Sequence, residues 1–308
     1  MLSRDYWPNT TFPDDLKAAL FEFVGTTVFL LLAFGGTQGS NEVEGSDLER
    51  TLYIATAFGL SLLVSAWFFF RATGGLFNPD VSLALLLIGA IGPVRFILFC
   101  IAQLTGAITA AAVILSLTPG ALTYNTVPSP NINLAQGVFI EMFITAALCL
   151  AVLMLAAEKH SATPFAPIGV GLTLFACHLF AVPYTGAAMN TARAFGPAVV
   201  TGFPGDAQWI YWLGPFLGAL LATAFYVCLK QYVILTSLPP PSPSPFPSWG
   251  LFSPLLRKVW TLTPKIAYLL STRVLDFQFQ LLCSTATNTG PSILGKKRPS
   301  LNCRHRIL

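Results

Sequence analysis

The chain has 308 residues, is 54% hydrophobic, carries only 10% charged residues and has a mean hydropathy of +0.68. Soluble domains usually contain about 25% charged residues, so this composition excludes an ordinary soluble protein and indicates several membrane-spanning helices. The net charge of +4 is uneven: residues 1–250 hold eight basic and twelve acidic side chains, and residues 251–308 hold nine and one. The basic excess therefore belongs to the C-terminal part, and no nucleic acid partner is expected.

Six apolar runs are each close to the roughly 20 residues that span a hydrocarbon core about 30 Å thick. In chain order they are residues 16–36, 52–70, 94–117, 134–157, 166–182 and 208–232. Two shorter segments, 78–88 after the second run and 190–200 after the fifth, each begin with asparagine, which caps helix N-termini well. Both are too short to span, so we expect re-entrant half-helices that are buried inside protein.

The order of elements occurs twice along the chain. Glu22 opens the first run in FEFVGTTVFLLLAFGG and Glu141 opens the fourth in IEMFITAALCLAVLM, with Asn78 and Asn190 following 56 and 49 residues later. Each repeat contains three spans, an odd number, so the two repeats must be inverted in the membrane. Inverted repeats place binding or conduction at the midplane between them. We expect an all-α polytopic membrane protein with six transmembrane helices and two re-entrant half-helices.

The predicted domain organisation has three parts. They are an N-terminal segment (1–15), a membrane domain (16–232, with repeats of about 16–117 and 134–232) and a C-terminal part (233–308). The last part opens with the Pro/Ser-rich linker SLPPPSPSPFPS and continues as basic sequence, for which we expect no fixed structure. A membrane-surface segment and a spurious extension are the alternatives.

Loop charges predict the orientation. Acidic side chains crowd the loop after the first run, whereas basic side chains lie in or beside the second and fourth loops. The latter are Arg71, Arg95 and Lys159. By the positive-inside rule both termini face the cytoplasm, in the plasma membrane or an internal membrane.

Four stretches together carry a family resemblance. They are TGGLFNPDVSLAL, AQLTGA, HLFAVPYTGAAMNTARAFGPAVV and WIYWLGPFLGALLA. In order and spacing they resemble the aquaporins of the major intrinsic protein family, and among them the orthodox water channels of fungi. The resemblance covers residues 16 to about 232. It implies half-helices that meet head to head at mid-membrane, one pore per subunit, a homotetramer in a lipid bilayer, water as the permeant, no cofactor and no enzymatic activity.

The resemblance places Asn78 and Asn190 at the centre of the pore. Each would cap its own half-helix through its side-chain oxygen and donate an N–H to passing water. The positive N-terminal ends of the two half-helices would repel cations and protons there. Glu22 and Glu141 would satisfy backbone N–H groups of the two re-entrant loops, and a proton relay is the alternative.

The midplane motif departs from the family pattern, which is Asn-Pro-Ala twice. This chain has Asn78-Pro79-Asp80 and Asn190-Thr191-Ala192. An unpaired acid where the half-helices abut would be costly, so we expect the hydroxyl of Thr191 to hydrogen-bond to Asp80. The carboxylate would also offset part of the positive barrier, giving a proton or cation leak or, alternatively, weak conduction.

The resemblance also implies a filter toward the outside, at positions counted from the two asparagines. Phe58 lies 20 residues before Asn78, and the other three members surround Asn190. They are His178, Ala187 and Arg193, which lie 12 before, 3 before and 3 after it. This filter quartet fits the water-selective pattern, and it disfavours the glycerol-conducting branch, where the His position is small and an Asp follows the Arg.

Two alternatives to a water channel remain from sequence. One is a non-conducting structural membrane protein on the same scaffold, and the other is a facilitator of glycerol or a similar small solute. An enzyme is not expected, because the spans carry no nucleophile–base cluster and no set of metal ligands. Gly106 and the segment GPFLG, residues 214–218, are predicted to be close helix–helix contacts.

Overall fold

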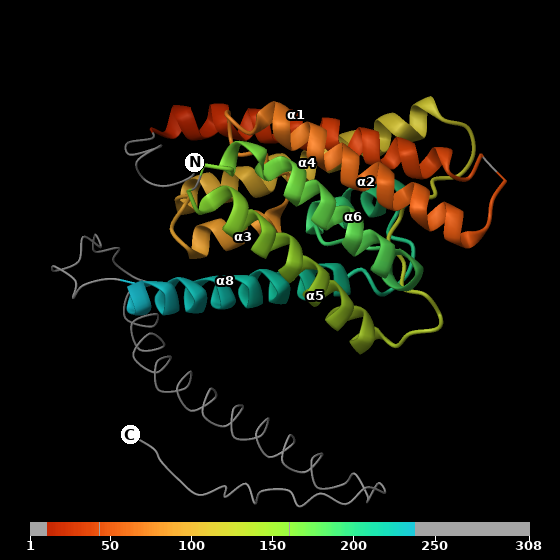
Figure 1. Cartoon of the computed structure of the whole chain (residues 1–308). Helices are drawn as coiled ribbons and strands as arrows, with labels where there is room; N and C mark the ends of the chain where they lie inside the picture. Colours follow the sequence, from red (N-terminus) through yellow and green to blue (C-terminus); the bar gives the residue numbers. More distant parts are fainter. Residues whose placement is uncertain (1–10, 43, 160, 238–308) are drawn as a thin grey trace, which may run out of the picture. The chain divides into compact units, whose positions relative to one another are not determined.

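The computed structural model describes residues 11–42, 44–159 and 161–237, and every regular element in these ranges is a helix (Figure 1). The elements are α1 (Phe12–Gly39), α2 (Asp47–Phe69), α3 (Pro79–Leu87), α4 (Pro93–Leu117), α5 (Leu134–Val152), the π-helix η1 (Leu153–Ala157), the 3-10 helix η2 (Thr163–Phe165), α6 (Ala166–Thr185), α7 (Thr191–Thr201) and α8 (Ile210–Ser237). Predictions for residues 1–10 and for the C-terminal part from residue 238 lie outside the described residues.

The predicted spans and half-helices are all present. Six helices are long and apolar enough to cross a membrane, with η1 completing the fourth span, and they coincide with the six apolar runs. The short helices α3 and α7 occupy the two re-entrant segments, each capped by the asparagine that precedes it. The predicted all-α architecture of six spans and two half-helices is confirmed.

Helix α1 begins four residues before the predicted boundary at residue 16. Thr11 and Asp14 form a capping box, in which the backbone N–H of Thr11 donates to the Asp14 carboxylate at 3.2 Å. Pro13 lies in the first turn, where a missing N–H costs nothing. The apolar run does not reveal this start, because the first turn of the helix is polar. At the other end of the domain, α8 continues five residues past the predicted limit at 232.

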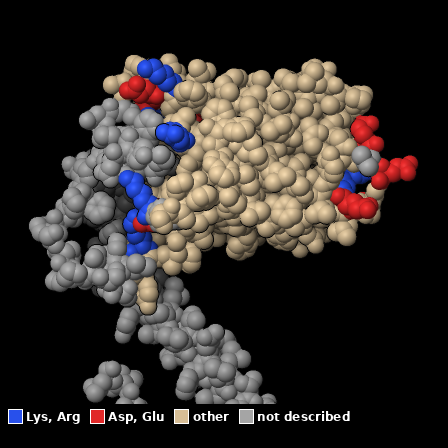
Figure 2. Space-filling view, turned by 45° about the horizontal axis from the view of Figure 1, so that its top comes forward, with Lys and Arg blue, Asp and Glu red and all other residues tan. Residues whose placement is uncertain are grey.

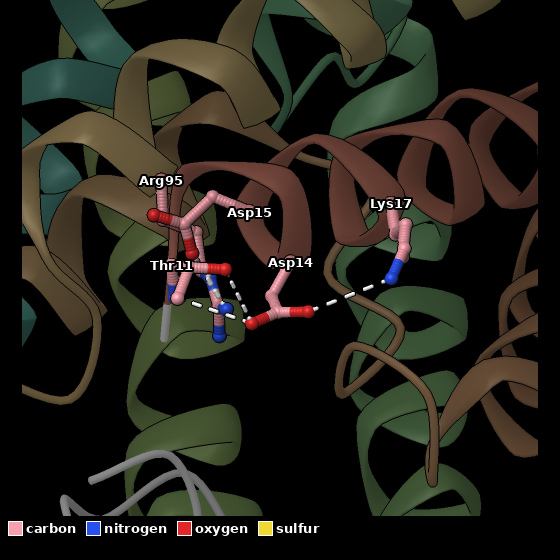
Figure 3. Close-up of polar contacts among 5 residues, drawn as sticks. All are labelled: Thr11, Asp14, Asp15, Lys17 and Arg95. Carbon is pink, nitrogen blue, oxygen red and sulfur yellow. Dashed lines mark hydrogen bonds and ion pairs between the residues drawn. The ribbon is translucent and has the colours of Figure 1, made fainter. Parts of the chain in front are cut away.

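The extra turn of α1 is tied to α4 by a buried ion pair (Figure 3). The Arg95 guanidinium donates from Nε to Asp15 Oδ1 at 2.7 Å, and its second nitrogen lies 2.6 Å from the same oxygen. Asp14, one residue earlier, points away toward Lys17 at 3.7 Å. The buried pair thus fixes one end of the α1–α4 contact, which runs along most of both helices.

Helix packing repeats between the two halves of the sequence. α1 packs against α4 and α2 in the first half, and α5 packs against α8 and α6 in the second. The halves meet where α2 lies along α6, and α7 of the second half packs on α4 of the first. A Cβ added at Gly218 would lie 2.5 Å from the Met142 carbonyl oxygen, and one at Gly106 would lie 2.8 Å from that of Phe23. The predicted close contacts at these glycines are confirmed.

The flanks of the helical bundle are apolar, and charged side chains gather at its two ends (Figure 2). Large hydrophobic side chains face outward on the spans, where a soluble protein would place polar ones. Examples are Leu20, Phe68, Ile97, Phe143 and Leu172. Polar side chains are instead found inside the bundle around α3 and α7, which is the arrangement expected when re-entrant segments line an internal path.

Candidate pore and constriction

The re-entrant loop before α3 is held by a buried carboxylate of α1. Glu22 is fully buried and accepts hydrogen bonds from the Thr73 hydroxyl and from the backbone N–H groups of Leu76 (3.2 Å) and Phe77 (2.8 Å). The Gln103 side chain of α4 donates a fourth hydrogen bond at 2.9 Å. These two loop N–H groups are therefore satisfied by the acid and not by another backbone carbonyl.

The second re-entrant loop is held in the same way. Glu141 of α5 is fully buried and accepts from the Thr185 hydroxyl (2.6 Å) and from the backbone N–H groups of Ala188 (3.0 Å) and Met189 (2.9 Å). The sequence prediction did not include Thr73 and Thr185. Each stands five residues before its asparagine and precedes a glycine, so superposing the two repeats would have found them.

Each asparagine caps its own half-helix. Asn78 Oδ1 accepts from the backbone N–H of Asp80 at 2.9 Å, and Asn190 Oδ1 accepts from those of Ala192 (2.9 Å) and Arg193 (3.2 Å). Because a free helix N-terminus leaves four N–H groups without partners, these caps stabilise α3 and α7 at a depth where water is scarce.

The two asparagines are also joined across the repeats. Asn78 Nδ2 donates to the Met189 carbonyl and Asn190 Nδ2 donates to the Phe77 carbonyl, both at 2.8 Å. Phe77 and Met189 adopt left-handed backbone conformations, with φ of 50° and 51°, which is uncommon for residues other than glycine. Such local strain turns each carbonyl toward the opposite asparagine. Each side-chain amide has a second N–H beyond the one that donates to these carbonyls.

The expected contact between the two motif departures is present. Asp80 Oδ2 accepts from both the backbone N–H and the hydroxyl of Thr191, each at 2.9 Å. The same hydroxyl oxygen lies 3.2 Å from the Tyr211 carbonyl of α8. Pro79 occupies the first position of α3, and Ala192 is fully buried at the second position of α7.

The filter quartet comes together in the structure. The Phe58 ring stacks on the His178 ring with centroids 4.3 Å apart, and the Arg193 guanidinium carbon lies 4.8 Å from the Phe58 centroid. Ala187 is fully buried, on the re-entrant loop before α7. Phe58 and Arg193 line the same cavity as Asn78 and Asn190, whereas His178 and Ala187 are not among its lining residues.

Arg193 is held by two backbone carbonyls. Its Nη1 donates to the Tyr124 carbonyl at 2.7 Å, and its Nη2 donates to that of Gly186 at 3.4 Å. Within the described ranges its Nε has no hydrogen-bond partner, and neither has Nε2 of His178. A buried charge in a span is expensive and is normally functional.

The loop that holds Arg193 was not predicted from sequence. Tyr124 stacks on Phe34 with centroids 4.6 Å apart, and its hydroxyl donates to the Ala111 carbonyl at 2.8 Å. Burial raises the pKa of Tyr124 to about 12, so the hydroxyl stays a donor at neutral pH. Gln38 of α1 clamps the same loop, donating to the Ala121 carbonyl at 3.1 Å and accepting from the Thr123 backbone N–H at 3.1 Å. Nothing in the sequence pattern around Tyr124 or Gln38 marks these two residues as supports of Arg193.

No cluster of three or more His, Cys, Asp or Glu side chains that could hold a metal occurs in the part of the chain that the structure describes. Each buried acid of the site is hydrogen-bonded by N–H or O–H donors: Glu22, Asp80 and Glu141. The cavity is lined mainly by apolar side chains, with Asn78, Asn190 and Arg193 as its polar members, and none of the three acids is among its lining residues.

Comparison with known proteins agrees with this geometry. The family model described as major intrinsic protein matches residues 9–226. Over 226 residues the chain is 63% identical to one aquaporin of the fungus Laccaria bicolor and 62% identical to another, Aquaporin-1, with 71% of this chain and 73% of each relative covered. The X-ray structure of the aquaglyceroporin from Plasmodium falciparum shares the fold, with a TM-score of 0.61 at 20% identity over 72% of this chain and 98% of that chain. The chain therefore belongs to the major intrinsic protein family, among the aquaporins, and is an integral multi-pass membrane protein.

Proposed function

We propose that this protein conducts water passively across a membrane and excludes glycerol. The observation that carries the proposal is the cluster of Phe58, His178 and Arg193 above a path that also contains both asparagines. Aromatic contact narrows the path at the cluster, while the unpartnered nitrogens supply hydrogen bonds at the same level. A molecule that passes must be small and must form hydrogen bonds.

The hydrogen-bonding groups of the cluster match water. His178 Nδ1 lies 3.0 Å from the Leu174 carbonyl, which can only accept, so Nδ1 carries the proton and Nε2 of the neutral ring is an acceptor. Arg193 Nε is a donor. Water can donate to the first and accept from the second, and this replaces part of the hydration that it loses on entry. The arginine charge opposes cations at the same point.

The proposed selectivity against glycerol follows from size. Phe58 and His178 are in ring contact and Arg193 packs against Phe58, so we propose that the constriction admits nothing wider than a single small molecule. A three-carbon polyol would also need an apolar face and several hydrogen-bond partners at once. We therefore place this chain with the water-selective aquaporins rather than the glycerol facilitators.

The proposal also includes the orientation of the protein in the membrane and its assembly. Acidic residues at the α1–α2 connection and basic residues at the opposite end support an orientation with both termini in the cytoplasm. We further propose a homotetramer with one pore in each subunit, in the plasma membrane or an internal membrane.

Stopped-flow light scattering of proteoliposomes tests the proposal. Under a sucrose gradient, vesicles with the protein should shrink several times faster than empty vesicles, and under a glycerol gradient they should show no added re-swelling. Phe58→Ala should admit glycerol by widening the constriction. Phe68→Ala is the matched control, because Phe68 lies on the same helix with its side chain 69% exposed. Shrinkage no faster than in empty vesicles would reject the proposal.

One observation favours a second candidate, a non-conducting structural membrane protein. The ring stack of Phe58 on His178, with Arg193 packed over it, leaves the first two side chains 1% and 0% exposed. A permanent contact of this kind would close the path. The sucrose measurement separates the two candidates directly.

A further inference from the structure

Asp80 caps a helix to which it does not belong. It lies in the first turn of α3, yet its Oδ2 accepts from the backbone N–H and the hydroxyl of Thr191, the first residue of α7. The N-terminus of α7 thus has two caps, the neutral amide of Asn190 and the carboxylate of Asp80. The N-terminus of α3 is capped by the amide of Asn78, and the Asp80 carboxyl also accepts from its own backbone N–H there.

This contact requires both departures from the family motif. A proline at position 191 would supply neither the N–H nor the hydroxyl, and an alanine at position 80 would supply no acceptor. Two donors directed at one carboxylate oxygen stabilise the ionised form of the acid, whereas burial of the group opposes ionisation. The hydroxyl has one proton, and it lies closer to Asp80 (2.9 Å) than to the Tyr211 carbonyl (3.2 Å).

The carboxylate changes the electrostatics of the midplane. Each half-helix N-terminus carries about half a positive charge, so the two together carry about one. A carboxylate in direct contact with one of these ends offsets most of that charge. Glu22 and Glu141 accept instead from loop N–H groups that precede the half-helices, among them those of Phe77 and Met189. Asp80 is the acid that touches a half-helix N-terminus.

We propose that Asp80 lowers the barrier to protons and monovalent cations, so that this channel has a cation leak beside its water conduction. The proposal depends on the proposed pore, because the affected ions would share the path lined by Asn78 and Asn190. It does not depend on how fast water moves through that path. Asp80 itself is not among the residues that line the cavity, so it acts through its charge and not by binding the ion.

The test compares ion flux among matched variants in proteoliposomes. Proton entry is followed with a pH-sensitive dye inside the vesicles under a pH gradient, with the membrane potential clamped by a potassium ionophore, and it is normalised to the reconstituted folded protein. Asp80→Asn keeps the size of the side chain and removes its charge. The double variant Asp80→Ala with Thr191→Pro restores the family motif in both repeats. Asp206→Asn is the control, because Asp206 is an exposed acid outside the site.

The wild-type protein should carry a proton flux above that of empty vesicles. This flux should fall roughly twofold to thirtyfold in Asp80→Asn and in the double variant, the range that corresponds to a charge at a helix terminus. It should be unchanged in Asp206→Asn. Equal flux in the wild type and the double variant, or a wild-type flux equal to that of empty vesicles, would overturn the proposal. The double variant keeps the test decisive if Asp80→Asn does not fold.

Water permeability, measured on the same vesicles by light scattering, separates the two proposals. An Asp80-dependent proton flux without accelerated shrinkage supports the leak and rejects the water channel. Accelerated shrinkage with a proton flux that is the same with and without Asp80 supports the water channel and rejects the leak.

Discussion

Removing the hydroxyl of Thr191 should destabilise the protein more when Asp80 is present than when it is absent. Thr191→Val keeps the shape of the side chain and the backbone N–H, and it deletes the O–H that donates to Asp80 Oδ2 at 2.9 Å. It also deletes the weaker contact with the Tyr211 carbonyl at 3.2 Å. The first loss requires Asp80 and the second does not, so a double-mutant cycle with Asp80→Ala isolates the pair.

The magnitude follows from the charge of the acceptor and from its surroundings. Hydrogen bonds to charged groups contribute roughly 1.5–3 kcal/mol in soluble proteins. Interhelical hydrogen bonds in a membrane protein average about 0.6 kcal/mol and reach about 1.7 kcal/mol. Because this bond is buried and its acceptor is a carboxyl group that also accepts from the Thr191 backbone N–H, we expect the upper part of the membrane range. Thr191→Val should lower the free energy of unfolding by about 1.5 kcal/mol in the wild type and by about 0.5 kcal/mol beside Asp80→Ala.

Denaturant titration in mixed micelles measures these free energies, with the fluorescence of the six tryptophans as the signal. Thr223→Val is the matched control, since the Thr223 hydroxyl is buried but donates only to the Ala219 carbonyl of its own helix. It should show no coupling to Asp80. Additivity of Thr191→Val and Asp80→Ala within about 0.3–0.5 kcal/mol would refute the reasoning, because it would mean that the contact contributes nothing to stability.

Three further predictions concern the supports of the site. Gln38→Ala should release the loop that holds Arg193, so the ratio of water to glycerol permeability in the light-scattering assay should fall while thermal stability changes little. Glu141→Gln leaves one oxygen to accept from three donors. It should lower the free energy of unfolding by about 1–3 kcal/mol and abolish water permeability. Unchanged permeability would contradict the proposed role of the acid. Gly196→Ala would place a Cβ 2.5 Å from the Ala107 carbonyl carbon, so α7 must shift from α4, at a cost of about 1–3 kcal/mol in micelle unfolding.

Most of the fold could be predicted from sequence because a membrane leaves few solutions. An apolar run of the right length must be a helix, and a short segment at that depth must be covered by protein. The first turn of α1 was missed because it is polar, and the prediction of the spans depended on apolar runs. Its signal lies in the capping box of Thr11 and Asp14 and in the partner that Asp15 finds on α4, and hydropathy records neither.

The site residues could be predicted only as far as the family resemblance supplies their spacing from the two asparagines. The two asparagines fix a frame, and the positions of Phe58 and Arg193 can be counted from that frame. The loop that carries Tyr124 has no such frame, because its contact with Arg193 joins residues 69 positions apart through a backbone carbonyl. A carbonyl is present in every residue, so the sequence cannot mark which one will accept.

The contact between Asp80 and Thr191 allows an acid to be buried, but it also weakens the electrostatic barrier at the midplane. Burying Asp80 between the half-helices without hydrogen-bond donors would be costly. Thr191 provides both an N–H and a hydroxyl, so the buried carboxyl group has partners. The cost is electrostatic, because the charge that the donors stabilise lies where two helix ends would otherwise repel cations. If the proposed leak exists, the barrier to protons and cations at the midplane is weak in this chain. Cation exclusion then depends chiefly on Arg193 and on the loop carbonyls that hold its guanidinium in place.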